Sequence, residues 1–446
     1  MANSSFNWPE RPDAPFLWSD RLRLTQGAVA RHASALAESI PDKKRVLIRT
    51  RPDLHGIAPI IACWLRGATA VLTDPRESEE ETSRIATRLN AAVWTPGPPL
   101  SISIADPSPL RLDPDAEAVA IRTSGSSGEP KFAVHRLGSL LANAEASNRR
   151  VPFSQEDCWL LSLSPHHVGG LGIVIRAMVA SACVHVGQGP GDLAVDLREH
   201  RWITHVSVVA TQLRRLLDDP SLDRRIIALR ALLLGGGPTP ARWRDEALDR
   251  GWPLYVTYGL TECASQVTTS LAMRGDDATD AGVPLDGVRV RCDEVGEIHV
   301  AGPTLFAGYL ESGATSPAAP TECATGDLGR FDERGRLQVL GRRDAMFVSG
   351  GENIRPEEIE NALRTIPGVS NACVVAVEDS IWVRRPVAFV AGAFDPANVE
   401  PVLAALPRYK WPDRIMAMPF EEAARAKPRR FALAAHVDLP PLWTKR

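Results

Sequence analysis

Short apolar runs alternate with helix-length segments over the first part of the chain. The runs have the length and composition of buried strands, and the segments between them are long enough for helices. Strands spaced in this way pair in parallel and are covered by helices on both faces. The pattern therefore predicts an α/β protein with a large N-terminal domain of parallel sheets. The apolar runs are residues 46–48, 70–72, 119–121, 159–161, 184–186, 206–209 and 232–234.

The pattern changes near residue 297. Short apolar segments at 297–300 and 336–340 are separated by glycines and charged turns, which predicts a small β-rich antiparallel unit. Beyond Asp344 we expect a small α+β domain with a helix over 356–364. Pro356 suits the first turn of that helix, and the glutamates that follow it complement the positive end of the helix dipole.

Composition and charge narrow the class of protein. Hydrophobic residues make up 44% of the 446 residues, which is enough for a sizeable core, and the formal net charge of −3 argues against a general nucleic-acid or membrane-surface binder. The seven cysteines form no C-x-x-C pair, which fits a reducing compartment without structural disulfides or zinc. No signal-peptide core precedes residue 21, and Arg176 and His185 interrupt the apolar stretch 168–186. We expect a cytoplasmic protein with no membrane partner.

A glycine- and hydroxyl-rich segment follows the apolar run 118–121 and ends at Lys131. Glycines let backbone N–H groups approach phosphate oxygens, the hydroxyls add donors, and the lysine adds positive charge. The segment therefore indicates a phosphate-binding loop, although an ordinary surface loop can have the same composition. Before the lysine it contains Thr123, Ser124, Gly125, Ser126, Ser127, Gly128, Glu129 and Pro130.

Three further segments follow in a fixed order, and together with this loop they resemble the acyl-adenylate-forming superfamily along essentially the whole chain. They are Y-G-L-T-E at 258–262, T-G-D at 325–327, and G-R-R-D at 341–344 followed by S-G-G-E-N-I-R-P-E-E-I-E at 349–360. The resemblance implies an ATP- and acid-binding domain over 1–342. It also implies a mobile C-terminal cap over 343–446 with its hinge at Asp344, and a coenzyme A tunnel beside Gly350 and Gly351.

The resemblance also implies ATP and Mg²⁺ and assigns roles to individual residues. Lys131 and its loop would cradle the phosphates, Thr261 would touch the α-phosphate, and Glu262 would hold Mg²⁺. A simple strand-ending turn, a turn aspartate and a solvated arginine are the alternatives for three parts of this set, residues 235–238, Asp327 and Arg342. The residues implied in nucleotide binding are Thr123, Ser124, Gly125, Ser126, Ser127, Gly128, Gly235, Gly236, Gly237, Tyr258, Gly259, Asp327 and Arg342.

Lys427 is the candidate for the lysine that neutralises charge between the carboxylate and the α-phosphate. It lies in A-K-P-R-R-F-A-L, which resembles the near-terminal lysine motif of the superfamily. Arg425 and Ala426 stand where small residues usually precede this lysine. The alternative is a simple basic patch, because Arg425, Arg429 and Arg430 surround it.

Several segments resemble the branch of the superfamily that activates 2-succinylbenzoate in menaquinone biosynthesis. Examples are 159–163, the segment around His167, and F-V-S-G-G-E at 347–352. On this resemblance His167, Ser207 and Gly259 would line the acid pocket. Arg176 either pairs with a protein carboxylate or faces the second carboxylate that this acid keeps after activation, since an unpaired buried charge is costly.

Other functions stay open at this point. The chain is expected to use a small carboxylic acid, ATP and coenzyme A, with no nucleic-acid partner, and whether copies form a homo-oligomer is left open. Another aryl- or acyl-CoA ligase, or a stand-alone adenylation enzyme that loads a carrier protein, would share the ATP motifs. A non-catalytic acyl-ligand sensor is disfavoured by the joint presence of Lys131, Glu262, Asp327 and Lys427. Gln266 and Phe132 depart from the usual pattern and concern the fit of the acid and the phosphate loop.

Overall fold

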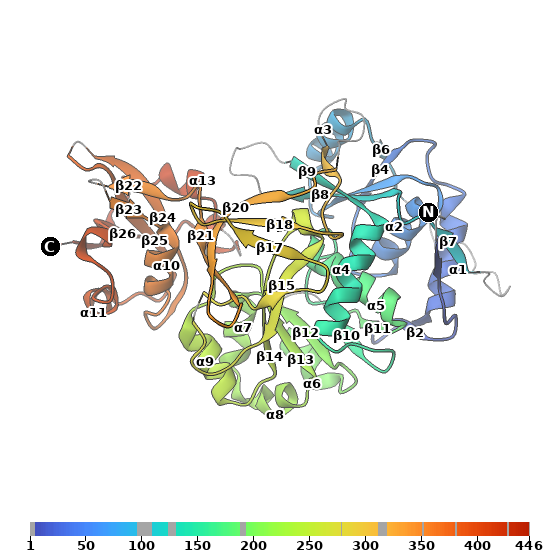
Figure 1. Ribbon diagram of the computed structural model, residues 1–446, viewed down its shortest axis with the longest axis horizontal. Coiled ribbons are helices and arrows are strands. Elements are labelled where there is room, and N and C mark those ends of the chain that lie inside the picture. The colour runs from blue at the N-terminus through green and yellow to red at the C-terminus, as the bar shows by residue number, and fades with distance from the viewer. Residues whose placement is uncertain are drawn as a thin grey trace.

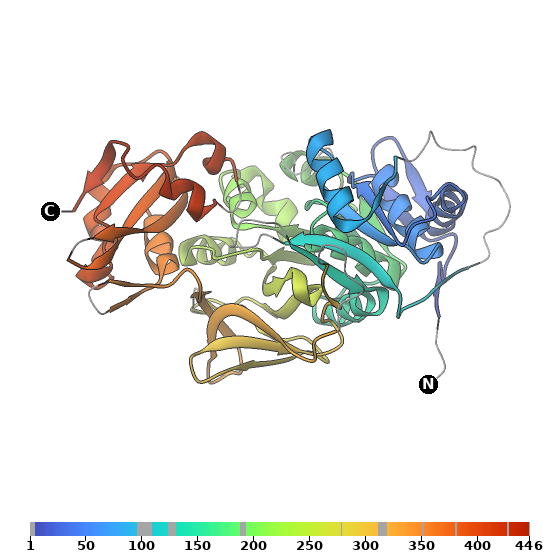
Figure 2. The ribbon, with the colours of Figure 1, turned by 90° about the horizontal axis from the view of Figure 1, so that it is seen from above.

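The structure is a computed structural model that describes residues 5–95, 109–123, 131–187, 193–277, 279–310, 319–349, 352–379, 381–425 and 428–445. Figure 1 shows a large body, coloured from blue to yellow, and a smaller orange and red unit at one end. The view from above, in Figure 2, also shows this unit set apart from the body.

The largest sheet of the body is mainly parallel. Strands β2, β11, β10, β12, β13 and β14 run in the same direction, as the apolar runs predicted, while β3, β15 and β16 join antiparallel at the two edges. In spatial order the strands are β16 (Val283–Pro284), β15 (Ser265–Leu271), β14 (Leu254–Leu260), β13 (Ala231–Leu234), β12 (His205–Val208), β10 (Cys158–Leu160), β11 (Cys183–His185), β2 (Pro15–Trp18) and β3 (Arg23–Thr25).

A second mixed sheet lies beside the first. Strands β6, β4, β5 and β8 are parallel, and β9 and β19 continue the sheet in antiparallel pairing. In spatial order the strands are β19 (Gly308–Leu310), β9 (Lys131–Arg136), β8 (Glu117–Thr123), β5 (Thr69–Thr73), β4 (Arg45–Arg49) and β6 (Ala92–Val93). A separate short pair joins β1 (Phe6–Trp8) to β7 (Leu110–Leu112).

Helices cover both sheets and form two main cores. One core lies between the sheets and contains side chains from α1, α2, α4 and α5; the other lies on the opposite face of the large sheet, under α6 to α9. The helices of the body are α1 (Gln26–Ala37), α2 (Leu54–Leu65), α3 (Glu79–Leu89), α4 (Leu137–Arg150), α5 (Val168–Ala180), α6 (Leu193–Glu199), α7 (Ala210–Leu217), α8 (Asp223–Ile227) and α9 (Ala241–Asp249), with the 3₁₀ turns η1 (Pro220–Leu222) and η2 (Thr261–Cys263).

Helix α3 shows how local sequence sets the limits of an element. The Ser78 hydroxyl accepts a hydrogen bond from the N–H of Glu81 at 3.1 Å, and three glutamates occupy the first turn, where the helix dipole favours negative charge. The helix ends at Leu89 because Asn90 adopts a left-handed conformation.

The antiparallel unit expected near residue 297 is confirmed. It consists of β17 (Arg289–Cys292), β18 (Glu297–Ala301), β20 (Cys323–Phe331) and β21 (Leu337–Arg342).

The C-terminal unit is α+β, as predicted. Helix α10 (Pro356–Leu363) begins at the expected proline. Two cores of this unit are built from residues between 347 and 443. Its other elements are β22 (Phe347–Ser349), β23 (Glu352–Ile354), β24 (Val369–Asp379), β25 (Val383–Gly392), η3 (Pro396–Asn398), α11 (Val399–Leu403), η4 (Arg408–Lys410), β26 (Arg414–Ala417), α12 (Phe420–Ala423), α13 (Arg430–Ala434) and β27 (Pro441–Thr444).

The long apolar stretch 168–186 forms α5, a turn and β11 within the core. Among the described residues, no helix is both long and apolar enough to cross a membrane.

Candidate active site

The candidate residues of the body gather where the parallel strands of the large sheet end. Ser207 lies at the end of β12, Gly235 follows β13, and Tyr258 lies near the end of β14. These three strands are neighbours and run in the same direction. In open α/β sheets, ligands bind outside the carboxyl ends of the strands, so the fold brings these segments to one ligand-binding edge.

A tyrosine, an aspartate and an arginine form a cluster next to this edge. The Tyr258 hydroxyl donates to Asp327 Oδ2 at 2.7 Å. Arg342 Nη1 donates to Asp327 Oδ1 at 3.3 Å and to the Thr325 carbonyl at 3.0 Å. Asp327 and Arg342 are cross-strand partners in β20 and β21. The pairing of these strands thus joins two motifs that the sequence identified separately, and it presents one fixed carboxylate at the edge of the cluster.

Electrostatics keep this cluster in defined ionisation states. Burial and the neighbouring Asp327 carboxylate raise the pKa of Tyr258 well above its usual value, so the phenol stays a hydrogen-bond donor. For Arg342, burial acts against the charge, but the hydrogen bond to Asp344 and the charge of Asp327 outweigh it and raise the pKa. The Arg342 Nε donates to Asp344 Oδ1 at 3.0 Å, which joins the expected hinge residue to the same cluster.

Glu262 is held by a tyrosine that sequence reasoning missed. The Tyr309 hydroxyl donates to Glu262 Oε1 at 2.6 Å, and the Nζ of Lys131 lies 5.2 Å from the centre of the Tyr309 ring. Burial and the Glu262 carboxylate raise the pKa of Tyr309. Tyr309 lies on β19 opposite Ala133 of β9, so strand pairing brings Glu262 and Lys131 to the same ring. No local signal in the sequence could have identified Tyr309.

Thr261 is positioned by a buried histidine. The His135 Nε2 lies 2.6 Å from the Thr261 carbonyl and donates to it, since a carbonyl can only accept. Burial lowers the pKa of His135 to about 4, so the ring is neutral. The alternating pattern of 131–136 could have marked His135 as an inward-facing side chain of a strand.

Two glycines of the candidate site are required by close contacts or by backbone conformation. A Cβ on Gly259 would lie 1.8 Å from the Ser265 carbonyl oxygen, at a bulge between β14 and β15. Gly236 has φ +85, which side chains rarely adopt, and Gly235 lies against Thr257 of β14. The turn 235–237 is therefore packed tightly beside the Tyr258 strand.

Arg176 is a buried cation with free hydrogen-bonding capacity. Its side chain is 1% exposed, its guanidinium lies 4.4 Å from the centre of the Trp159 ring, and Nε and Nη1 make no hydrogen bond. Among the described residues, no carboxylate forms an ion pair with it. Burial lowers its pKa to about 9, as expected for an unpaired buried charge. The Trp159 Nε1 donates to Ser207 Oγ at 3.1 Å, which connects this cation to the end of β12.

Two other candidates for the acid pocket differ in exposure. His167 caps the start of α5 and is exposed, with its ring 4.4 Å from that of the buried His166. Gln266 is buried, its Oε1 accepts from Thr269 at 3.1 Å, and its Nε2 makes no hydrogen bond.

Part of the expected site lies outside the described residues. Thr123 and Lys131 are described, as paired residues at the ends of β8 and β9. The predicted loop and tunnel positions and the catalytic lysine lie in the ranges that are not described, namely Ser124, Gly125, Ser126, Ser127, Gly128, Gly350, Gly351 and Lys427.

Comparison with known proteins defines the class. The sequence pattern of the AMP-binding enzymes matches residues 89–310, and that of the AMP-binding enzyme C-terminal domain matches residues 358–419. The chain belongs to the AMP-binding enzyme family.

The similar proteins within this family share one activity. The chain is 33% identical to the 2-succinylbenzoate–CoA ligase of Bacillus cytotoxicus, over 78% of this chain and 79% of that protein. It is 39% identical to the 2-succinylbenzoate–CoA ligase of Salmonella typhimurium, and this match spans 64% of the relative's length. A solved structure of Escherichia coli MenE with bound OSB-AMS has a TM-score of 0.80 at 29% identity, covering 96% of both chains.

Proposed function

We propose that the chain is an ATP-dependent acid–CoA ligase whose acid is 2-succinylbenzoate, acting in menaquinone biosynthesis. In the first half-reaction a carboxylate oxygen attacks the α-phosphate of ATP, giving an acyl-adenylate and pyrophosphate. In the second, the thiol of coenzyme A attacks the acyl carbonyl and AMP leaves. The free thiols of the chain and its use of ATP and coenzyme A agree with a cytoplasmic reaction.

The Tyr258–Asp327–Arg342 cluster supports the nucleotide half of the proposal. An ionised carboxylate held by a phenol and a guanidinium presents fixed acceptors to the two ribose hydroxyls. The packed turn at 235–237 supplies a flat backbone surface for adenine beside the Tyr258 strand. Lys131 lies at the end of the strand that follows the phosphate loop, where its charge would meet the phosphates.

Glu262 fits the Mg²⁺ that accompanies ATP. One oxygen is fixed by Tyr309, and a single carboxylate combined with substrate phosphates and water is the usual set for this ion. The ion would neutralise phosphate charge. In this arrangement Tyr309 fixes the orientation of the Glu262 carboxylate, and His135 fixes the backbone of Thr261 next to it.

The observation that carries the choice of acid is the unpaired guanidinium of Arg176. A buried cation with two donors free is costly for the ligand-free protein, and a ligand carboxylate would satisfy both. 2-Succinylbenzoate has two carboxylates, so one remains to pair with Arg176 while the other is activated. A monocarboxylate would leave this cation unpaired.

A panel of acids tests the proposal. AMP release is measured with ATP, Mg²⁺ and coenzyme A, and the coenzyme A product is identified by mass spectrometry. We expect the highest kcat/KM for 2-succinylbenzoate and a low value for 4-oxo-4-phenylbutanoate, which lacks one carboxylate. Equal rates with the two acids would contradict the choice of acid, and AMP release without a thioester product would favour loading of a carrier protein.

Substitution of Asp327 by alanine is expected to raise the KM for ATP at least about tenfold, because hydrogen bonds to charged groups contribute about 1.5–3 kcal/mol each. The matched control is Asp332→Ala in the turn between β20 and β21, where the carboxylate accepts from the N–H of Arg336 at 2.8 Å. The control should leave the KM for ATP unchanged. A similar rise in both variants, measured by initial rates, would mean that Asp327 acts only through the fold of this hairpin.

Asp344→Pro tests the hinge between the proposed domains 1–342 and 343–446. The separate cores of the C-terminal unit support this division. Proline restricts the backbone at residue 344 and at the preceding residue, so rotation of the cap should be hindered. We expect one half-reaction to slow much more than the other when adenylate formation and thioester formation are assayed separately. Equal losses in both would exclude this hinge.

A further inference from the structure

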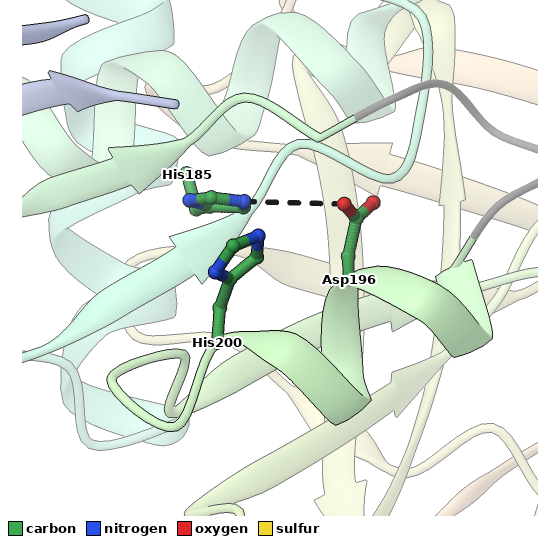
Figure 3. Close-up of side chains that lie close together, drawn as sticks. All are labelled: His185, Asp196 and His200. Carbon is green, nitrogen blue, oxygen red and sulfur yellow. Dashed lines mark ion pairs between the residues drawn. The ribbon is translucent and has the colours of Figure 1, made fainter. Parts of the chain in front are cut away.

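A buried cluster of two histidines and an aspartate lies outside the site described above. Figure 3 shows His185, Asp196 and His200 facing one another between the large sheet and α6. Their side-chain ligand atoms all lie within 4.8 Å of one another, and His185 Nε2 lies 4.0 Å from Asp196 Oδ1. All three residues are buried.

The fold fixes these three side chains independently. His185 ends β11 and is held between β10 and β2 by its pairing with Leu160 and Trp18. The N–H of His200 donates to the Asp196 carbonyl at 3.0 Å, so these two residues lie one helical turn apart and on the same face of α6.

The cluster belongs to the opposite face of the sheet from the proposed acid pocket. Leu160, the cross-strand partner of His185, packs in the core under α6 to α9, whereas Trp159 packs in the core under α5. None of the residues assigned to nucleotide, acid or coenzyme A belongs to this cluster.

The imidazoles of the cluster have unused ligand capacity. Neither ring nitrogen of His185 or of His200 makes a hydrogen bond. The nearest Asp20 oxygen lies 2.9 Å from His200 Nε2, outside hydrogen-bonding geometry. Polar groups buried without partners are costly, so native structures normally satisfy them with protein, water or metal. Burial lowers the pKa of His185 to about 4, so its ring is in the neutral form that binds metals.

We propose that His185, Asp196 and His200 bind one Zn²⁺ ion, which fastens α6 to the end of β11. Imidazole and carboxylate ligands suit Zn²⁺ and do not suit Mg²⁺, which prefers oxygen ligands only. Bond lengths of about 2.0–2.2 Å would require the ligand atoms to approach by roughly 1–1.5 Å, which side-chain rotation can supply. The carboxylates of Asp196 and Asp20 balance the charge of a dication.

The surroundings of the cluster resemble those of a structural metal site. The Trp202 ring lies 4.7 Å from the His200 ring and Trp18 packs edge-on against Trp202, so an aromatic wall excludes solvent. The spacing of the cysteines gave no sign of zinc because this set contains no thiolate. The ligands are also separated in sequence by a strand end and a helix. This inference does not rest on the proposed ligase activity.

The test uses the full chain, freed of metal with a chelator and titrated with Zn²⁺ against a chromophoric competitor. We expect one tightly bound equivalent in the wild type. Asp196→Asn and His200→Gln should each weaken Zn²⁺ binding by at least about tenfold, since even the outer partners of metal ligands have effects of this size. The control His436→Gln changes an exposed histidine of the C-terminal unit and should bind as the wild type does. Equal affinity in all four proteins, or no tight equivalent, would overturn the proposal.

A second measurement needs no variant and covers the case in which a cluster variant fails to fold. X-ray absorption at the zinc edge of the wild type should show imidazole nitrogen and carboxylate oxygen ligands. All seven cysteines are free thiols and offer a competing site, so sulfur ligands in the spectrum would contradict the assignment. Zn²⁺ should also raise the Tm of the wild type, because an ion that binds only the folded state stabilises it. No such rise would likewise contradict the proposal.

Discussion

Replacing Arg176 with methionine is expected to lower kcat/KM for 2-succinylbenzoate by at least about 30-fold while the KM for ATP stays unchanged. Truncating one partner of a buried charge pair costs about 2–5 kcal/mol. The ligand-free variant should unfold at the same temperature as the wild type or higher. The reason is that methionine removes a buried charge that makes no ion pair within the described part of the chain.

Two controls separate this role from a structural one. Arg149→Met removes an exposed arginine of the neighbouring helix α4, which pairs with Asp286, and should change neither kcat/KM nor Tm appreciably. With 4-oxo-4-phenylbutanoate, the Arg176→Met variant should turn over at least as fast as the wild type, since no second carboxylate needs the cation. A lower Tm combined with an unchanged KM for 2-succinylbenzoate would show that Arg176 serves the fold.

Replacing Lys427 with alanine is expected to slow adenylate formation by roughly 10²–10³-fold, the usual effect of removing one preorganised charge-stabilising group. Only in that step does negative charge build up between the carboxylate and the α-phosphate. Conversion of chemically supplied acyl-adenylate to the thioester should be nearly unchanged. Lys131→Ala should also slow the ATP step and spare the second step. Rapid-quench assays of the two half-reactions measure these effects.

The arginines around Lys427 provide the matched control. Arg425 pairs with Glu422, and Arg430 pairs with Glu357 and Glu360 of α10, so these cations are engaged within the C-terminal unit. Arg425→Ala removes a neighbouring positive charge of the same segment and should leave both half-reactions within about twofold, as expected for an exposed ion pair. Equal losses in Arg425→Ala and Lys427→Ala would favour the basic-patch alternative.

Sequence reasoning predicted the parallel strands and the start of α10 because their signals are local. An apolar run bounded by turns identifies a buried strand, and Pro356 followed by glutamates identifies a helix start. Strand β15 gave no such signal, because its buried threonines are polar. Thr268, for example, is buried only because its hydroxyl donates to the Ala281 carbonyl at 2.6 Å. That partner is fixed by the tertiary structure.

The candidate site divides in the same way. Asp327 and Arg342 were identified from motifs, and strand pairing explains their contact. Tyr309 and His135, which hold Glu262 and Thr261, could not be assigned from spacing, because each acts on a residue far away in the sequence. Arg176 was identified as an anomaly within an apolar run, but the sequence left its partner open. The structure removes the protein-carboxylate alternative within the described residues.

The most direct test of the central claim follows an oxygen atom. The acid is labelled with ¹⁸O in its carboxylates and incubated with ATP, Mg²⁺, coenzyme A and the enzyme, and the products are examined by mass spectrometry. If the carboxylate attacks the α-phosphate, one ¹⁸O moves into AMP when the thioester forms, and pyrophosphate carries no label. Label in inorganic phosphate together with release of ADP would contradict the account, because the attack would then occur at the γ-phosphate.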